Sequence, residues 1–121
     1  MDYEINHDKL NNIIIVRVKG IIDVTLWVKM SSELIVLAEK NKCIKILIDL
    51  KMAELESKIF DMQDCLYILK CINSSRICKH AIVANDINFG FLLNKTMSMG
   101  RRHDAIFFND EEQAVEWLLG N

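Results

Sequence analysis

The chain has 121 residues, of which 51% are hydrophobic and 26% are charged, and its formal net charge at pH 7 is −2. This length suits a single domain over residues 1–121, and the apolar content excludes a disordered chain. The small net charge gives no general attraction to nucleic acid or to an anionic membrane. No apolar run approaches the roughly 20 residues that span a bilayer, and the first residues lack the basic start of a signal peptide. We therefore expect a cytoplasmic protein without a membrane span.

The cysteines and histidines do not predict a metal site. No two cysteines form a Cys-x-x-Cys pair, and the three histidines lie far apart in the sequence, whereas zinc ligands usually come in closely spaced pairs. In a reducing compartment, cysteines without such spacing are most often small buried hydrophobic residues. We expect no cofactor, and we predict this buried role for Cys43, Cys65, Cys71 and Cys78.

The first part of the chain predicts a β-hairpin. Apolar and polar residues alternate over residues 2–7, and residues 13–19 form a second β-branched run, which together predict two strands. The segment 9–12 between them contains two asparagines that suit left-handed turn geometry. We expect Gly20 to end the second strand.

An amphipathic helix is predicted next. Either Asp23 or Thr25 can cap its start, and the pattern runs to about Lys40. One face is apolar, which predicts packing against a sheet. The residues of that face are Leu26, Trp27, Met30, Leu34, Leu37 and Ala38.

The run over residues 44–50 is almost entirely apolar and β-branched, which predicts a central strand buried on both faces. Asp49 is expected to mark the point at which this strand leaves the core. Strands and helices then alternate, so the fold class is α/β, with a single mixed five-stranded sheet, an antiparallel N-terminal strand and about four helices. The later elements are a helix over 57–72, a strand over 80–84, a helix over 88–99, a strand over 105–108, and a last helix capped by Asn109 or Asp110 and docked by Ala114, Val115, Trp117 and Leu118.

A resemblance to a known family rests on the order and spacing of four segments, Val16–Gly20, Ile46–Leu50, Ala81–Asp86 and Ala105–Leu118. With these segments the chain resembles STAS domains, the family of anti-sigma-factor antagonists and sulfate-transporter regulatory domains. It looks most similar to the small bacterial STAS-like proteins of unknown role. The resemblance covers nearly the whole chain, and it implies a STAS-like fold and a regulatory role through protein binding.

The chain departs from the family at its regulatory serine. In antagonist-type STAS domains the central strand is followed by Asp-Leu-Ser, and a serine in a later Asp-Ser-Ser/Ala-Gly run is phosphorylated by a partner kinase. Here Asp49-Leu50 match, but Lys51 stands in the place of the serine. Ser57 is the nearest candidate phosphosite, and it lies out of place in a run without glycine. The ordinary interpretation of Ser57 is a helix cap. Because of these departures, we predict that the serine motif is not intact.

Charged residues are predicted to separate between the two ends of the sheet. Basic residues gather before the strands and acidic residues after them, a pattern that helix capping and helix dipoles explain without a functional role. The edge beyond the strands would then be an acidic rim with Lys51 and Lys58 as the opposing cations. Such a rim and the absence of a glycine-rich loop argue against a nucleotide pocket and favour a basic protein surface as partner. The acidic residues are Asp23, Asp49, Glu54, Glu56, Asp86, Asp110, Glu111 and Glu112.

We expect a non-enzymatic interaction domain that docks a protein at the end of the central strand, through Asp49, Lys51, Glu54, Ser57 and Lys58. Two alternatives stay open. The predicted second and third helices are apolar on more than one side, which suits either a homodimer contact or a carrier of a small lipid-like ligand between them. An enzyme would need a pocket that unites Asp49 and Asp86 with His80 or His103, and both histidines are predicted at the opposite edge.

Overall fold

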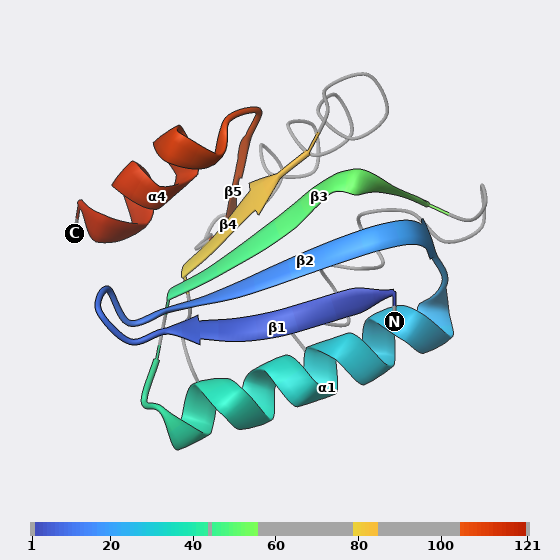
Figure 1. The fold of residues 1–121 in the computed structure, drawn as a ribbon, viewed down its shortest axis with the longest axis horizontal. Coiled ribbons are helices and arrows are strands. Elements are labelled where there is room, and N and C mark those ends of the chain that lie inside the picture. The colour runs from blue at the N-terminus through green and yellow to red at the C-terminus, as the bar shows by residue number, and fades with distance from the viewer. Residues whose placement is uncertain (1, 44, 56–78, 85–104, 121) are drawn as a thin grey trace.

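The fold is described from a computed structural model, in which residues 2–43, 45–55, 79–84 and 105–120 are described (Figure 1). The helices predicted over 57–72 and 88–99 lie outside these residues, and so does the lipid-like groove predicted between them. The described elements are β1 (Tyr3–Asp8), β2 (Ile13–Ile22), α1 (Val24–Lys40), β3 (Lys45–Leu55), β4 (Lys79–Val83), β5 (Ala105–Phe108) and α4 (Glu111–Leu119).

The described strands form one mixed sheet with the order β1-β2-β3-β4-β5. The pair β1 and β2 is antiparallel, and the pairs from β2 to β5 are parallel. The predicted α/β class, with a mixed sheet that begins in an antiparallel hairpin, is confirmed. Asn12, in the turn of this hairpin, has a φ of 52°, which is the left-handed geometry that its sequence predicts.

The alternation of side chains along the strands divides the core into two layers. Val16 and Ile48 face α1 and pack with its buried Trp27. Leu47 and Ala81 face the other way and pack against α4. Figure 1 shows α1 lying along β1 and β2, and α4 beside β4 and β5. Each of these helices therefore covers its own face of the sheet.

The predicted docking residues of both helices are confirmed. In α4, Ala114 and Leu118 are buried, and Val115 and Trp117 pack against the same cluster. The Trp117 ring lies 5.9 Å from that of Phe108 on β5, centroid to centroid. Cys43 is also buried, as predicted, and its Sγ donates to the backbone oxygen of Asn12 at 3.0 Å. The other three cysteines lie outside the described residues.

Two predicted strand ends are wrong, because β2 and β3 both continue past them. β2 runs through Gly20 to Ile22, and β3 runs six residues beyond Asp49 to Leu55. Gly20 has a φ of +83°, a conformation that glycine adopts without a steric penalty, so it bends β2 without ending it. Asp49 consequently lies within a strand and not at an exit from the core.

β3 carries a β-bulge at this point. Arg17 pairs with Asp49, but two residues later Lys19 pairs with Met52, so β3 advances by three residues where β2 advances by two. The extra residue exchanges the faces of the side chains that follow. Ala53 packs toward the α1 layer, and Met52 is 71% exposed.

Asp23, and not Thr25, caps α1. Its carboxylate accepts a hydrogen bond from the backbone N of Leu26 at 2.7 Å. We expect Asp23→Ala to lower the free energy of unfolding by about 1 kcal/mol, because the first turn loses an acceptor for one of its free N–H groups. Thr25→Ala, at an exposed position in the same turn, should change it by less than about 0.5 kcal/mol. Urea unfolding followed by circular dichroism measures both, and equal effects would contradict the assignment.

Candidate functional site

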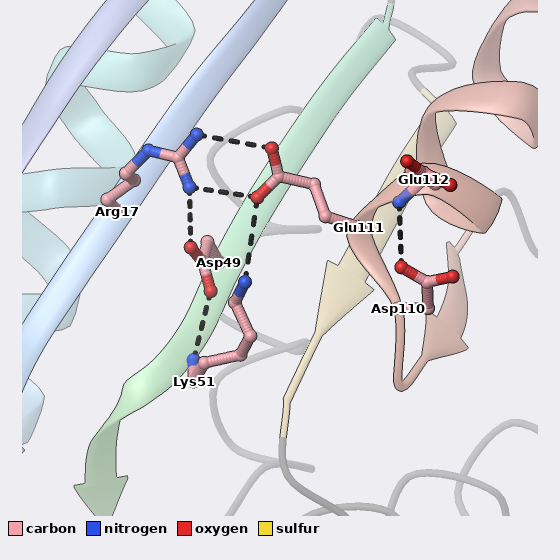
Figure 2. Close-up of polar contacts among 6 residues, drawn as sticks. All are labelled: Arg17, Asp49, Lys51, Asp110, Glu111 and Glu112. Atoms are coloured by element: carbon pink, nitrogen blue, oxygen red, sulfur yellow. Dashed lines mark hydrogen bonds and ion pairs between the residues drawn. The ribbon is translucent and has the colours of Figure 1, made fainter.

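The candidate site is a group of charged side chains on the α4 face of the sheet, in its carboxyl half. Arg17 on β2 and Asp49 on β3 are paired in the register of the two strands, so their side chains leave the sheet on the same face. Glu111 is the first residue of α4, which starts directly after β5. Figure 2 shows the three side chains converging, with Lys51 beside them. Residues from three elements, β2, β3 and α4, therefore meet here.

Arg17 is the centre of this group. Its Nη1 donates to Asp49 Oδ2 at 2.6 Å and to Glu111 Oε1 at 2.9 Å, and its Nη2 donates to Glu111 Oε2 at 3.2 Å. The contact with Glu111 is thus bidentate, the arrangement in which an arginine–carboxylate pair is strongest and best oriented. Arg17 therefore ties the start of α4 to the two strands beneath it.

Asp49 is the most deeply placed of these charges, with 7% of its surface exposed. Its second carboxylate oxygen, Oδ1, accepts a hydrogen bond from the backbone N of Lys51 at 3.0 Å. This N–H belongs to the bulged part of β3, where a ladder partner is commonly missing. One carboxylate therefore accepts hydrogen bonds from both the Arg17 guanidinium and the bulge. These bonds offset the cost of burying its charge.

Glu111 has cationic side chains on two sides. Besides the Arg17 contact, Lys51 Nζ lies 3.8 Å from its Oε1. The hydrogen bonds from Arg17 are the main reason that the pKa of Glu111 lies below its ordinary value of 4.5, with burial opposing and Lys51 adding a smaller effect. The same hydrogen bonds raise the pKa of Arg17. Arg17, Lys51, Asp49 and Glu111 thus form a group with balanced formal charges.

An acidic hollow lies beside this balanced group. Its volume is about 510 Å³, and it opens at the start of α4. Asp110 caps the helix by accepting from the backbone N of Glu112 at 3.1 Å. The hollow is lined by more carboxylates than cations, so it favours a cationic group over an anionic one. The lining residues are Lys51, Asn109, Asp110, Glu111, Glu112, Val115 and Glu116.

The structure brings together some of the residues predicted for a docking site. Asp49 and Lys51 meet at the ion group, whereas Glu54 lies further along β3, opposite Ile21, and is exposed. Ser57 and Lys58 lie outside the described residues.

Arg17 and Glu111 were missed as site residues. A sequence signal for Arg17 does exist, because it interrupts the apolar second strand at a position whose neighbours Val16 and Val18 are buried. The register that sets it opposite Asp49 is not readable from the sequence. The predicted rim of acids opposed by Lys51 and Lys58 is therefore corrected, since Arg17 contributes a further cation.

The described residues give no metal or membrane feature. In these parts of the chain, no three His, Cys, Asp or Glu side chains are grouped so that they could hold a metal ion. No described helix is long and apolar enough to cross a membrane. His80 pairs with Ile46, three residues before Asp49 on β3, which separates the two by about 10 Å at ~3.3 Å per residue. Asp86 and His103 lie outside the described residues.

The fold is similar to that of two solved structures. An anti-sigma factor antagonist from Mycobacterium paratuberculosis has a TM-score of 0.64 at 17% identity, over 96% of this chain and 93% of that chain. An uncharacterized protein of the DUF3478 family with a SpoIIAA-like fold, from Shewanella loihica, has a TM-score of 0.62 at 17% identity, over 96% and 91%. No protein-family model and no curated protein matches the sequence. The predicted STAS-like fold is thus confirmed by structural similarity.

The ion group should contribute to stability through Arg17. Arg17→Met leaves the Asp49 carboxylate mostly buried without its guanidinium partner, so we expect the free energy of unfolding to fall by about 2 kcal/mol, between the values for exposed and fully buried pairs. Lys51→Met removes the longer contact to Glu111, made by a half-exposed side chain, and should cost less than about 1 kcal/mol. Urea unfolding at neutral pH compares the two variants, and an Arg17 effect no larger than the Lys51 effect would contradict the geometry.

The Glu111 contact should also be visible in the pH dependence of stability. Because the pKa of Glu111 is lower in the folded chain than in the unfolded one, its ionised carboxylate stabilises the fold above the ordinary pKa of 4.5. That stabilisation is lost as the pH falls through the lowered, folded-state pKa. The difference in unfolding free energy between the parent and Glu111→Gln should therefore be constant at neutral pH and shrink below about pH 4.5.

Urea unfolding at a series of pH values measures this difference. Glu112→Gln, an exposed neighbour in the same helical turn, is the matched control. A difference that stays constant into the acid range would show that Arg17 does not hold the Glu111 carboxylate.

Proposed function

We propose that this chain is a non-enzymatic regulatory domain of the STAS-like type, which acts by docking a protein partner at the carboxyl edge of its sheet. The observation that carries the proposal is the exposed apolar surface on the β2–β3 extension. Met52 is 71% exposed and Ile21 is 60% exposed. Met52 pairs with Lys19, and Ile21 pairs with Glu54, so both apolar side chains lie on one face of the two strands.

Such a surface is costly to leave in water and suits burial against another protein. Large apolar side chains that gather on a surface and are rimmed by charges are typical of protein–protein contacts. Here Lys19, Lys51 and Glu54 supply the rim. The geometry supports the predicted docking residues Asp49, Lys51 and Glu54, but with different roles. Asp49 lies beneath the surface and holds it in place. Met52 and Ile21 would make the apolar contact with the partner.

The charge of the neighbouring hollow supports a partner with a basic surface. Asp110, Glu112 and Glu116 line the hollow, and the cations Arg17 and Lys51 nearby are engaged by Glu111. A lysine or arginine of a partner would find carboxylates there that are accessible to solvent. This electrostatic match would raise the association rate and select the orientation more than it would add to affinity.

The described polar residues support binding better than catalysis. The two most enclosed carboxylates of the site accept hydrogen bonds from Arg17, which orients them as structural anchors. A general base needs a free lone pair facing a substrate, and a nucleophile needs a base beside it. The ion group meets neither requirement among the residues described.

Docking would not depend on the family's regulatory serine. Lys51 stands where antagonist-type relatives have the first serine, and its backbone N–H and side chain serve Asp49 and Glu111. Lys51 would therefore be a constant part of the surface that a partner meets. Ser57 stays a candidate phosphosite.

Crosslinking in the native host tests this proposal. The tagged parent chain should capture a specific protein, and Met52→Asp should lower its recovery at least about tenfold, because the substitution adds a charge to the centre of the contact. Val28→Asp is the matched control, since Val28 is also an exposed apolar residue but lies on α1. Quantitative mass spectrometry of the crosslinked material measures the recovery.

Two results would contradict the proposal. One is equal recovery with Met52→Asp and the parent, and the other is equal loss with Met52→Asp and Val28→Asp. Ser57→Ala should retain the partner, and its failure to do so would show that docking requires that serine.

A further inference from the structure

A second surface lies at the other margin of the sheet, where the edge strand β1 runs beside α1 (Figure 1). A groove of about 480 Å³ separates the two elements, and its exposed lining is mostly apolar. Val36, in its middle, is 66% exposed. This groove belongs to the α1 layer and has no residue in common with the proposed docking surface. Its lining residues are Ile5, Ser32, Glu33, Val36, Leu37 and Lys40.

The helical side of the groove has opposite charges at its two ends. Glu33 and Lys40 are seven residues apart, which is about two turns of helix and about 10.5 Å at ~1.5 Å per residue. They therefore lie on the same side of α1, with the apolar pair Val36 and Leu37 between them. The midpoint of Glu33 and Lys40 falls between residues 36 and 37. A two-fold rotation about this point therefore exchanges the acidic end with the basic end, and the two apolar residues with each other.

We propose that this groove is a two-fold self-association surface whose partner is a second copy of this chain. A two-fold axis through the groove centre sets two α1 helices antiparallel. Each Glu33 then faces Lys40 of the partner subunit, and the apolar pairs pack across the axis. An isologous contact needs a surface that complements itself, and this spacing supplies that complementarity.

The charges at both ends are available for such pairs. Lys40 makes no ion pair with any described residue. Glu33 accepts a hydrogen bond from the hydroxyl of Tyr3, 2.6 Å from Oε2, which leaves Oε1 for a partner. Burial, with the Glu33 contact adding to it, raises the pKa of Tyr3 to about 12, so the hydroxyl remains a donor at neutral pH. Tyr3 thus holds the carboxylate in place at the groove end.

The groove is small, so we expect the two copies to associate weakly. Specific, stable interfaces bury at least about 1,200 Å² in total, and smaller contacts are typical of weak association. We therefore expect a concentration-dependent dimer in the micromolar range.

Charge reversal followed by mixing tests the proposal. In Glu33→Lys two lysines would meet at each end, and in Lys40→Glu two glutamates would meet, so each variant alone should dimerise about tenfold more weakly than the parent. Mixed in equal amounts, the two variants restore an opposite pair at both ends. The mixture should therefore associate about as strongly as the parent. Sedimentation velocity from about 1 to 500 µM measures each sample.

Further variants separate the surface from its surroundings. Val36→Glu places a charge at the groove centre and should abolish the dimer. Val28→Glu, at a site on α1 that does not line the groove, should leave it unchanged. Tyr3→Phe reports whether loss of the Tyr3 contact explains the Glu33→Lys effect, and it should retain at least most of the dimer.

Three results would overturn the proposal. They are a parent that stays monomeric at every concentration, a dimer that Val36→Glu leaves intact, and a mixture of the two charge variants that associates no better than either one alone. Circular dichroism of each variant, compared with the parent, shows that the fold is retained.

Discussion

The parallel pairing of β2 with β3 is the interaction on which the other described features depend. It joins the N-terminal hairpin to the parallel part of the sheet, and it continues to Ile22 and Leu55, beyond the pairing of either strand with β1 or β4. Its register sets Arg17 opposite Asp49, and its bulge presents a backbone N–H to the same carboxylate. The attachment of α4 through Glu111 and the outward direction of Met52 both follow from this one alignment.

The sequence predicted the features that depend on local chemistry. An asparagine in the hairpin turn, a side-chain cap before each described helix and an apolar stripe on α1 act through neighbours within about four residues, and all are confirmed. The two predicted strand ends were wrong because those predictions also relied on local chemistry alone. Gly20 and Asp49 are typical strand terminators when considered alone, but pairing with a neighbouring strand supplies hydrogen bonds that outweigh such local preferences.

The ion group was only half predicted, because its members come from distant parts of the chain. Asp49 and Lys51 were identified from their place after an apolar run. Arg17 and Glu111 lie 94 residues apart and meet through the tertiary fold. A carboxylate as enclosed as Asp49 does imply a cationic partner, since burying an unpaired charge is costly. The choice among fifteen lysines and arginines, however, requires the register of the sheet.

The extra residue in β3 has a consequence for comparing this chain with its structural neighbours. Because side chains alternate along a strand, an alignment with a regular strand that sets no gap opposite the extra residue would assign every later residue of β3 to the wrong side. Ala53 would be taken for a surface residue and Met52 for a core residue, the reverse of their positions. Deletion of the extra residue, by contrast, would restore regular alternation and leave Met52 and Ala53 on their present sides.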